Sequence, residues 1–321
     1  MSEIALTPVE VTSLSDIGRV RTNNQDACGE FANDAGWRAL VVADGMGGHR
    51  GGEVASRIAV DTIGQMLGTS HDAPERSLRN AFLAANERVL EVADSDPRCA
   101  GMGTTAVALL FAAEGQAWVA HVGDSRAYVY RGGELIALTA DHSYVAELQR
   151  RGFISPAEAA VHPRRNEVLR SIGGEPYLDV EIRGVDTFPG DCFLLCTDGL
   201  WGCVPESEMV AALARTPLEE AVRMLVELAN RHGGPDNVTV QLARIPEPAS
   251  AAPETPTRGE ADEASAEEAY TSPWSRIPPA AIGASLLAAI LVAAFLWVHF
   301  ARENSPNAHG AAASQPGKDR P

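Results

Sequence analysis

Residues 39–45 read ALVVADG, an apolar run that ends in an acid and a glycine. The runs AHVGDS at 120–125 and LLCTDG at 194–199 end in the same way, and GPDNV at 234–238 places an acid just before an apolar run. Each glycine is expected to adopt a backbone conformation that other residues avoid, which turns its carbonyl toward a common point. The pattern predicts that strand ends on one edge of a sheet gather four carboxylates, those of Asp44, Asp124, Asp198 and Asp236.

Clustered carboxylates repel one another unless a positive charge lies among them. Because these positions offer oxygen ligands and no His or Cys, the ion they favour is Mg²⁺ or Mn²⁺, not Zn²⁺. A single Asp-Gly after a strand is usually only a turn, but four such acids within 245 residues indicate a site. Two cations about 3.5 to 4 Å apart hold a bridging water and clamp a phosphoryl group. The reaction class that follows is phosphoester hydrolysis.

The rest of the chain up to residue 245 alternates helical and strand patterns in blocks. Apolar stripes over 55–66 and 78–92 predict two amphipathic helices, and a helical pair is expected at 206–213 and 218–231. The turn Arg131-Gly132-Gly133 predicts a hairpin. Blocks of this kind favour an α+β fold with antiparallel sheets. The predicted strands are 39–43, 105–110, 117–122, 127–130, 180–185, 192–196 and 238–242.

Seven motifs carry a family resemblance. They are SDIGRVRTNNQD at 15–26, VVADGMGGH at 41–49, GMGTTAV at 101–107, HVGDSRAYVYRGG at 121–133, LTADHS at 138–143, LLCTDGLWG at 194–202 and GGPDNVTV at 233–240. In order and spacing this set resembles the bacterial branch of the metal-dependent protein phosphatase family, also called protein phosphatase 2C. The resemblance implies a sandwich of two antiparallel β-sheets flanked by α-helices, with a binuclear Mg²⁺ or Mn²⁺ centre at one edge. It also implies that a metal-activated water hydrolyses phosphoserine and phosphothreonine in proteins.

The resemblance also implies roles for individual residues. Asp44 is similar to the ligand that bridges two metals, with the carbonyl of Gly45 on one of them and Asp198 and Asp236 on the other. Asp124 is similar to the ligand of a third, weaker metal. Asp26 is similar to an acid that contacts the metal ligands without binding the metals itself. Arg21 is similar to the arginine that binds the substrate phosphate.

Two positions depart from relatives of this family. Gln25 offers no carboxylate, and Met46 stands where the eukaryotic branch carries a histidine as a candidate general acid. The sequence leaves the proton donor open between His49 and a metal-bound water. Residues 144–176, called the flap below, resemble the mobile flap beside the family's active site and contain five arginines that could recruit phosphorylated segments.

Composition excludes some functions. The net charge of −17 argues against nucleic acid as a partner. The five cysteines match no CxxC or zinc spacing, which predicts reduced thiols in the cytosol. The first residues, MSEIALTPVEVTS, lack a basic segment followed by an apolar one, so we expect no cleaved signal peptide.

Four segments follow one another along the 321 residues. Residues 1–245 form the catalytic domain, and 246–276, rich in Pro, Ala and Glu, are expected to be a disordered acidic linker. Residues 277–301 contain no Asp, Glu, Lys or Arg and predict one transmembrane helix, followed by a short extracytoplasmic tail at 302–321.

The orientation of that helix is open to two arguments. Basic residues are slightly more frequent after it than before it. The cost of exporting a folded domain without a signal outweighs this excess. We therefore expect a single-pass protein of the inner membrane with its catalytic domain in the cytoplasm.

The function expected from the sequence is dephosphorylation of proteins, opposing bacterial Ser/Thr kinases, with these kinases and their substrates as partners. A pseudophosphatase that binds phosphoproteins for signalling is one alternative. The intact Asp44, Asp198, Asp236 and Arg21 argue against it. The other alternative is a phosphatase for small phosphoesters. The membrane anchor and the flap arginines weakly favour macromolecular substrates instead.

Overall fold

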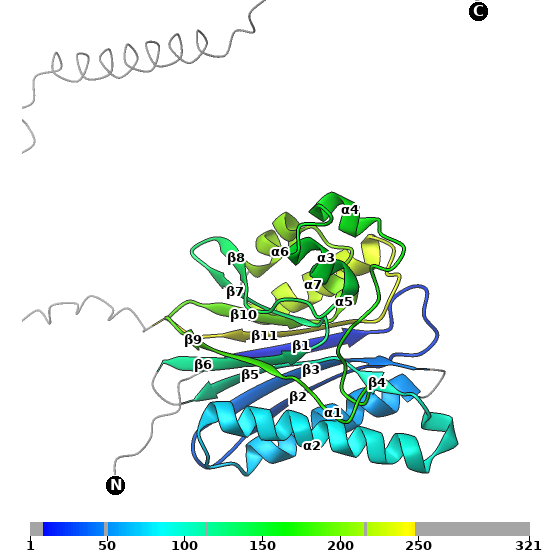
Figure 1. Cartoon of the computed structure of the whole chain (residues 1–321). Coiled ribbons are helices and arrows are strands. Elements are labelled where there is room, and N and C mark those ends of the chain that lie inside the picture. The colour runs from blue at the N-terminus through cyan, green and yellow to red at the C-terminus, as the bar shows by residue number, and fades with distance from the viewer. Residues whose placement is uncertain (1–8, 48–50, 113–114, 215–216, 248–321) are drawn as a thin grey trace, which may run out of the picture. The chain divides into compact units, whose positions relative to one another are not determined.

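Two antiparallel β-sheets pack face to face in the computed structural model, which describes residues 9–47, 51–112, 115–214 and 217–247 (Figure 1). The first sheet has the order β1 (Glu10–Asp16), β11 (Val238–Arg244), β10 (Cys192–Cys196), β7 (Arg126–Arg131) and β8 (Glu134–Ala137). The second has the order β2 (Asp26–Ala32), β3 (Arg38–Met46), β5 (Ala106–Ala112), β6 (Gln116–Val122) and β9 (Glu181–Asp186), with the short β4 (Gly103–Thr104) paired to β3. The predicted sandwich is confirmed.

The strand that contains the motif ALVVADG is buried on both of its faces. Ala39, Val41 and Ala43 pack in the layer between the second sheet and its helices, whereas Leu40 and Val42 pack between the two sheets. Because successive side chains of a strand point to opposite faces, a strand buried on both faces needs an uninterrupted apolar run. Burial on both faces therefore explains why the run before Asp44 is entirely apolar.

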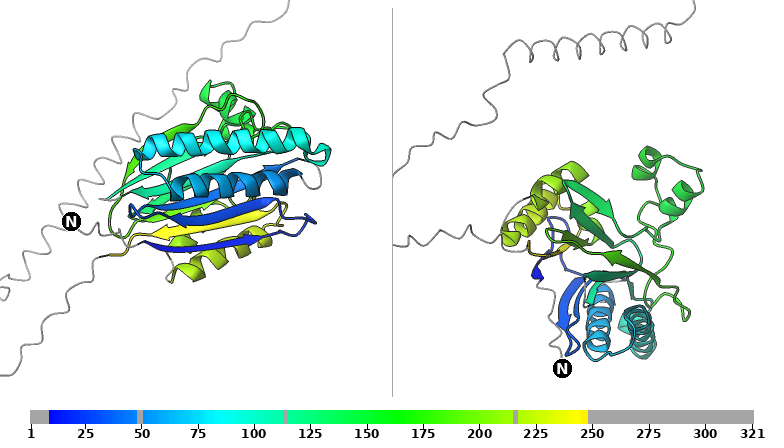
Figure 2. Two further views of the ribbon diagram at one scale, coloured as in Figure 1. Left: turned by 90° about the horizontal axis from the view of Figure 1, so that it is seen from below. Right: turned by 90° about the vertical axis from the view of Figure 1, so that its left-hand side faces the viewer.

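Helices cover the outer face of each sheet (Figures 1 and 2). The long α1 (Gly51–Gly68) and α2 (Pro74–Ser95) lie over the second sheet, and the short helix η1 (Pro97–Cys99) follows α2. The pair α6 (Glu206–Leu213) and α7 (Leu218–Arg231) covers the first sheet. All four long helices were predicted, but Met66, placed in the buried stripe of α1, is 40% exposed.

Four strands were not predicted: β1, β2, β8 and the two-residue β4. β1 reads EVTSLSD and β2 reads DACGEFA, and both are mostly half-buried or exposed. β8 has one half-buried and three exposed residues. Its hairpin with β7 closes through the predicted turn, where Gly132 and Gly133 take φ values of 59° and 90°.

The flap stands beside the sandwich and carries two short helices, α3 (Tyr144–Arg150) and α4 (Pro156–Ala160) (Figure 2, right). Its base is a small pairing of Ser143 with Val168. The remaining helix, α5 (Asp198–Trp201), directly follows β10.

The structure describes Pro246 and Glu247 at the start of the predicted linker. The rest of that linker, the predicted membrane helix at 277–301 and the tail at 302–321 lie outside the described residues. None of the helices within the described ranges combines the length and apolar character needed to cross a membrane.

Candidate metal centre

The four predicted carboxylates line one cavity of about 220 Å³, called here the four-carboxylate cavity. Asp44 lies in β3, Asp124 in the loop after β6, Asp198 at the start of α5, and Asp236 in the loop before β11. The two sheets therefore each contribute to the site, and the sequence prediction that these acids meet is confirmed in position. The cavity is also lined by Arg21, Gln25, Gly45, Met46, Gly47, Thr105, Asn166, Val168 and Asn237.

The surroundings of these acids favour their protonated forms. Desolvation, followed by the negative charges of neighbouring acids, raises the pKa of Asp44 well above its usual range. The same two causes raise the pKa of Asp124 to about 7 and that of Asp198 to about 6. Ionising these acids together would bring several negative charges close to one another without enough local positive charge to offset them.

A divalent cation fits this arrangement. The Oδ1 atom of Asp198 is shielded from solvent and has no hydrogen-bond partner, which is a costly state for a carboxylate oxygen. The side chains that converge on the cavity offer oxygen atoms, the ligand type that Mg²⁺ and Mn²⁺ prefer. A bound cation would satisfy the orphaned oxygen and reduce the repulsion at once.

The glycines that follow Asp44 and Asp198 are needed for close approach. A Cβ on Gly45 would lie 2.0 Å from the carbonyl oxygen of Gly52, and one on Gly199 would lie 1.9 Å from that of Asn237. Neither glycine has a positive φ. The prediction that these two adopt conformations closed to other residues was therefore wrong, since what they provide is room for a second backbone.

Two threonines and one asparagine hold the cavity together, and the sequence analysis gave them no role. Thr105 accepts a hydrogen bond from the amide of Asp44 at 3.0 Å, and Thr104 donates to the carbonyl of Asp44 at 2.8 Å. Asn237 donates to the carbonyls of Ile17 and Asn23. Only their position in the sequence could have indicated this role. Each of the three residues lies within one of the quoted motifs, and Asn237 directly follows Asp236.

Asp26 is not part of the lining of the four-carboxylate cavity. It is 9% exposed and accepts hydrogen bonds from Thr197 at 2.9 Å and Thr239 at 2.7 Å. Burial is the main cause that raises its pKa to about 7. It lines a different cavity of about 420 Å³, between β2 and α1, and its negative charge contributes to the raised pKa of Asp44.

Arg21 reaches the cavity from the loop after β1. Its guanidinium donates to Oδ2 of Asp236 at 2.7 Å, and its side chain is 51% exposed. The pairing places a half-exposed positive charge at the cavity rim, where an incoming anion would meet it. The predicted phosphate-binding residue is therefore at the site, although here it contacts a predicted metal ligand.

Gln25 and Met46 line the cavity, whereas His49 lies outside the described residues. The side chain of Gln25 donates to the carbonyl of Gly47 at 3.3 Å. No histidine is among the described residues of the lining.

The flap reaches the cavity with Asn166 and Val168. Three of its arginines have acidic partners close by: Arg150 and Arg151 share Glu147, and Arg164 pairs with Glu167. Arg170 pairs with Asp179 at 2.9 Å. These ion pairs weaken the expectation that the flap presents a basic surface.

Comparisons with known proteins agree with this geometry. The family model of protein phosphatase 2C matches residues 18–245. The serine/threonine phosphatase stp of Listeria monocytogenes is 41% identical over 235 residues, which cover 71% of this chain and 92% of that protein. A serine/threonine phosphatase of S. agalactiae has a similar structure, with a TM-score of 0.70 and 35% identity over 74% of this chain and all of that one. The catalytic domain of PstP, solved with two manganese ions, has a TM-score of 0.68 and 34% identity over 74% of this chain and 99% of that one.

Proposed function

The chain belongs to the protein phosphatase 2C family, and from this premise we propose that the four-carboxylate cavity is its catalytic centre. The chain is a metal-dependent serine/threonine protein phosphatase. The observation that supports this choice of cavity is the shielded, unpartnered Oδ1 of Asp198 among three further acids. This concentration of acids supports a bound cation, which the proposed hydrolysis needs.

Asp44 and the carbonyl of Gly45, together with Asp198 and Asp236, are the residues that would hold two Mn²⁺ or Mg²⁺ ions, and Asp124 would hold a third, weaker one. When bound, such ions lower the pKa of a water for attack and neutralise the phosphoryl oxygens. Asp26 fixes the rear of the cluster through Thr197 and Thr239.

Arg21 is the residue that would bind the substrate phosphate. Its planar guanidinium offers two parallel donors to two phosphate oxygens. Its contact with Asp236 holds it at the rim until a phosphate arrives. A cation on Asp236 would weaken that contact, which frees the guanidinium for the substrate.

One assay tests this function. The full chain in detergent should hydrolyse a phosphothreonine peptide with Mn²⁺ and stop when a chelator is added. A small aryl phosphate, tested alongside, should be a poorer substrate by kcat/KM. Binding of the peptide without turnover would overturn the proposal, and a preference for the aryl phosphate would indicate a small-phosphoester phosphatase.

We further propose that the enzyme is a single-pass inner-membrane protein that opposes Ser/Thr kinases from the cytoplasmic side. The support is in the sequence: residues 277–301 lack charged side chains, and the acidic linker of 246–276 separates them from the domain. The full chain should sediment with membranes and resist carbonate extraction, and protease outside spheroplasts should leave the domain intact. Cleavage of the domain from outside would reverse the topology.

A further inference from the structure

His142 lies at the base of the flap, and the proposed reaction does not use it. Its main-chain amide donates to the carbonyl of Gly123 at 3.0 Å, and the amide of Gly123 donates to its ring atom Nδ1 at 3.2 Å. These two hydrogen bonds hold both polar groups of Gly123, the residue directly before Asp124. The carbonyl of His142 also accepts from the amide of Leu169, within the flap, at 2.7 Å.

The backbone conformation of Gly123 must be held by hydrogen bonds from neighbouring residues. Its φ is +102°, and a Cβ there would lie 2.5 Å from the side chain of Thr105, so only glycine fits. Glycine loses more conformational freedom on folding than any other residue. The direction of Asp124 therefore depends on bonds from its neighbours. On its other side, Trp201 donates to the carbonyl of Asp124 at 3.0 Å.

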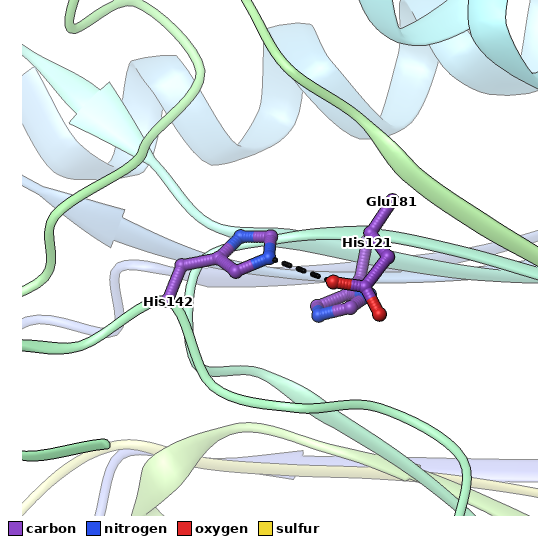
Figure 3. Close-up of side chains that lie close together, drawn as sticks. All are labelled: His121, His142 and Glu181. Atoms are coloured by element: carbon purple, nitrogen blue, oxygen red, sulfur yellow. Dashed lines mark hydrogen bonds and ion pairs between the residues drawn. The ribbon is translucent and has the colours of Figure 1, made fainter. Parts of the chain in front are cut away.

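The ring of His142 is fixed in one tautomer by its contacts. It stacks on His121 at 4.5 Å between ring centres, with an angle of 20° between the planes, and its Nε2 lies 3.3 Å from Oε2 of Glu181 (Figure 3). Because Nδ1 accepts from the amide of Gly123, the neutral ring carries its proton on Nε2 and donates it to Glu181. Burial lowers the pKa of His142 to about 4, which keeps the ring neutral.

His121, His142 and Glu181 are close enough together to suggest a metal ion, but their geometry argues against one. A metal ligand must present a lone pair in the plane of its ring, and two nearly parallel stacked rings cannot both aim at one ion. A metal on Nε2 of His142 would also require a proton on Nδ1, where the ring already accepts a hydrogen bond. We therefore interpret the cluster as a hydrogen-bonded support.

We propose that His142 is a positioning residue that clamps Gly123 through Nδ1 and its main chain, and thereby aims Asp124 at the weaker third cation. The proposal rests on the proposed function, because that function assigns Asp124 as a ligand. It adds that the base of the flap and this ligand are held by the same residue.

Two uncharged substitutions separate the hydrogen bond from the bulk of the ring. In His142→Asn the amide oxygen stands near the place of Nδ1 and can accept from Gly123. In His142→Gln the polar atoms stand near the place of Nε2 and can serve Glu181 only. Both variants lose the stack on His121, so a merely structural role would affect both alike.

The readout is Mn²⁺ binding by the full chain in detergent, measured from the electron paramagnetic resonance of free Mn²⁺, with Asp124→Asn as the reference for loss of the weakest site. We expect His142→Gln to weaken that site about tenfold, the lower end of the range for residues that support a metal ligand. His142→Asn should bind as the wild type does. The control Glu181→Gln, whose amide oxygen still accepts from Nε2, should also leave binding unchanged.

Wild-type binding by His142→Gln, or equal weakening in both His142 variants, would overturn the positioning role. Loss of a cation in Glu181→Gln would show that the cluster is a metal site and would overturn it as well. Should His142→Gln fail to fold, histidine ¹⁵N spectra of the Mg²⁺-loaded wild-type protein decide the matter, since a proton on Nδ1 of His142 contradicts the proposal. A wild-type chain that binds Mn²⁺ but hydrolyses no phosphopeptide would instead refute the proposed function.

Discussion

Asp26 lies directly opposite Asp44 in the register of β2 and β3. One acid is buried behind the sheet edge and the other lines the cavity, so each is part of the other's electrostatic surroundings. The acids thus lie in two layers, one lining the cavity and one behind it. Without cations, the free energy of unfolding must depend on how many of these acids are protonated.

We expect the metal-free protein to lose stability as the pH rises from about 4 to about 7. The folded-state pKa values of Asp26 and Asp124 are raised from 3.8 to about 7, so the folded state binds more protons than the unfolded state in that window. Unfolding then releases protons, and the free energy of unfolding falls with pH. Thermal melts with a chelator at pH 5, 6, 7 and 8 measure this trend.

Saturating Mn²⁺ should weaken that trend, because it removes the contribution of Asp124 and leaves that of the buried Asp26, and it should raise the melting temperature at pH 8. Binding at a hundredfold excess over the dissociation constant adds about 2.7 kcal/mol per site. A chelated protein that is as stable at pH 8 as at pH 5 would contradict the assigned charge cluster.

Asp44→Asn, Asp198→Asn and Asp236→Asn should each abolish Mn²⁺-dependent turnover, because a carboxamide cannot offset a cation's charge. The loss should exceed about 100-fold in kcat, since losing even a residue that supports a ligand typically costs about 10- to 100-fold. The fold should remain, because each change relieves repulsion in the metal-free state. The exposed Asp34→Asn serves as the matched control, and near-normal kcat in any of the three would refute the binuclear assignment.

Arg21→Ala should mainly raise KM, with a smaller fall in kcat, because its contact with phosphate exists already in the bound substrate. A hydrogen bond to a charged group contributes about 1.5 to 3 kcal/mol, which corresponds to a rise in KM of about 10- to 100-fold. Half of this side chain is exposed, so we expect the lower end. Steady-state kinetics on a phosphothreonine peptide, with the exposed Arg88→Ala as control, measure the split.

His49→Gln should retain most of the activity. The position that matches the general acid of eukaryotic relatives is Met46, which lines the cavity, so water can protonate the leaving oxygen. Two substrates test this. The leaving group of an alkyl phosphate needs a proton, whereas that of a nitrophenyl phosphate does not. A large loss on the first substrate only would identify His49 as the acid.

The sequence was most informative where burial is greatest. The runs that end in Asp44 and Asp198 are buried strands, and their apolar residues predicted both the strands and the place of the acids. The edge strand β1 has only two apolar residues, three positions apart among polar ones, and could not be distinguished from a loop. Its place is fixed by pairing with β11, more than 200 residues away, which local patterns do not encode.

Within the site, the acids could be predicted and their supports could not. Thr105 and Asn237 act through hydrogen bonds to main-chain groups of segments that are distant in sequence. Threonine and asparagine are common in turns, so their type alone does not reveal such a role. The role of Gly45 was misjudged because it depends on the close approach of the Gly52 backbone in α1, which the residue types do not reveal.

The pairing of β1 with β11 joins the first described strand to the last, with Glu10 opposite Arg244. Contacts between such distant parts of a chain form late, because a long loop must close first. Arg21 follows the first of these strands and Asp236 precedes the last. A chain that ends before Asp236 therefore lacks both this acid and the strand with which β1 pairs, so we expect it to have no phosphatase activity.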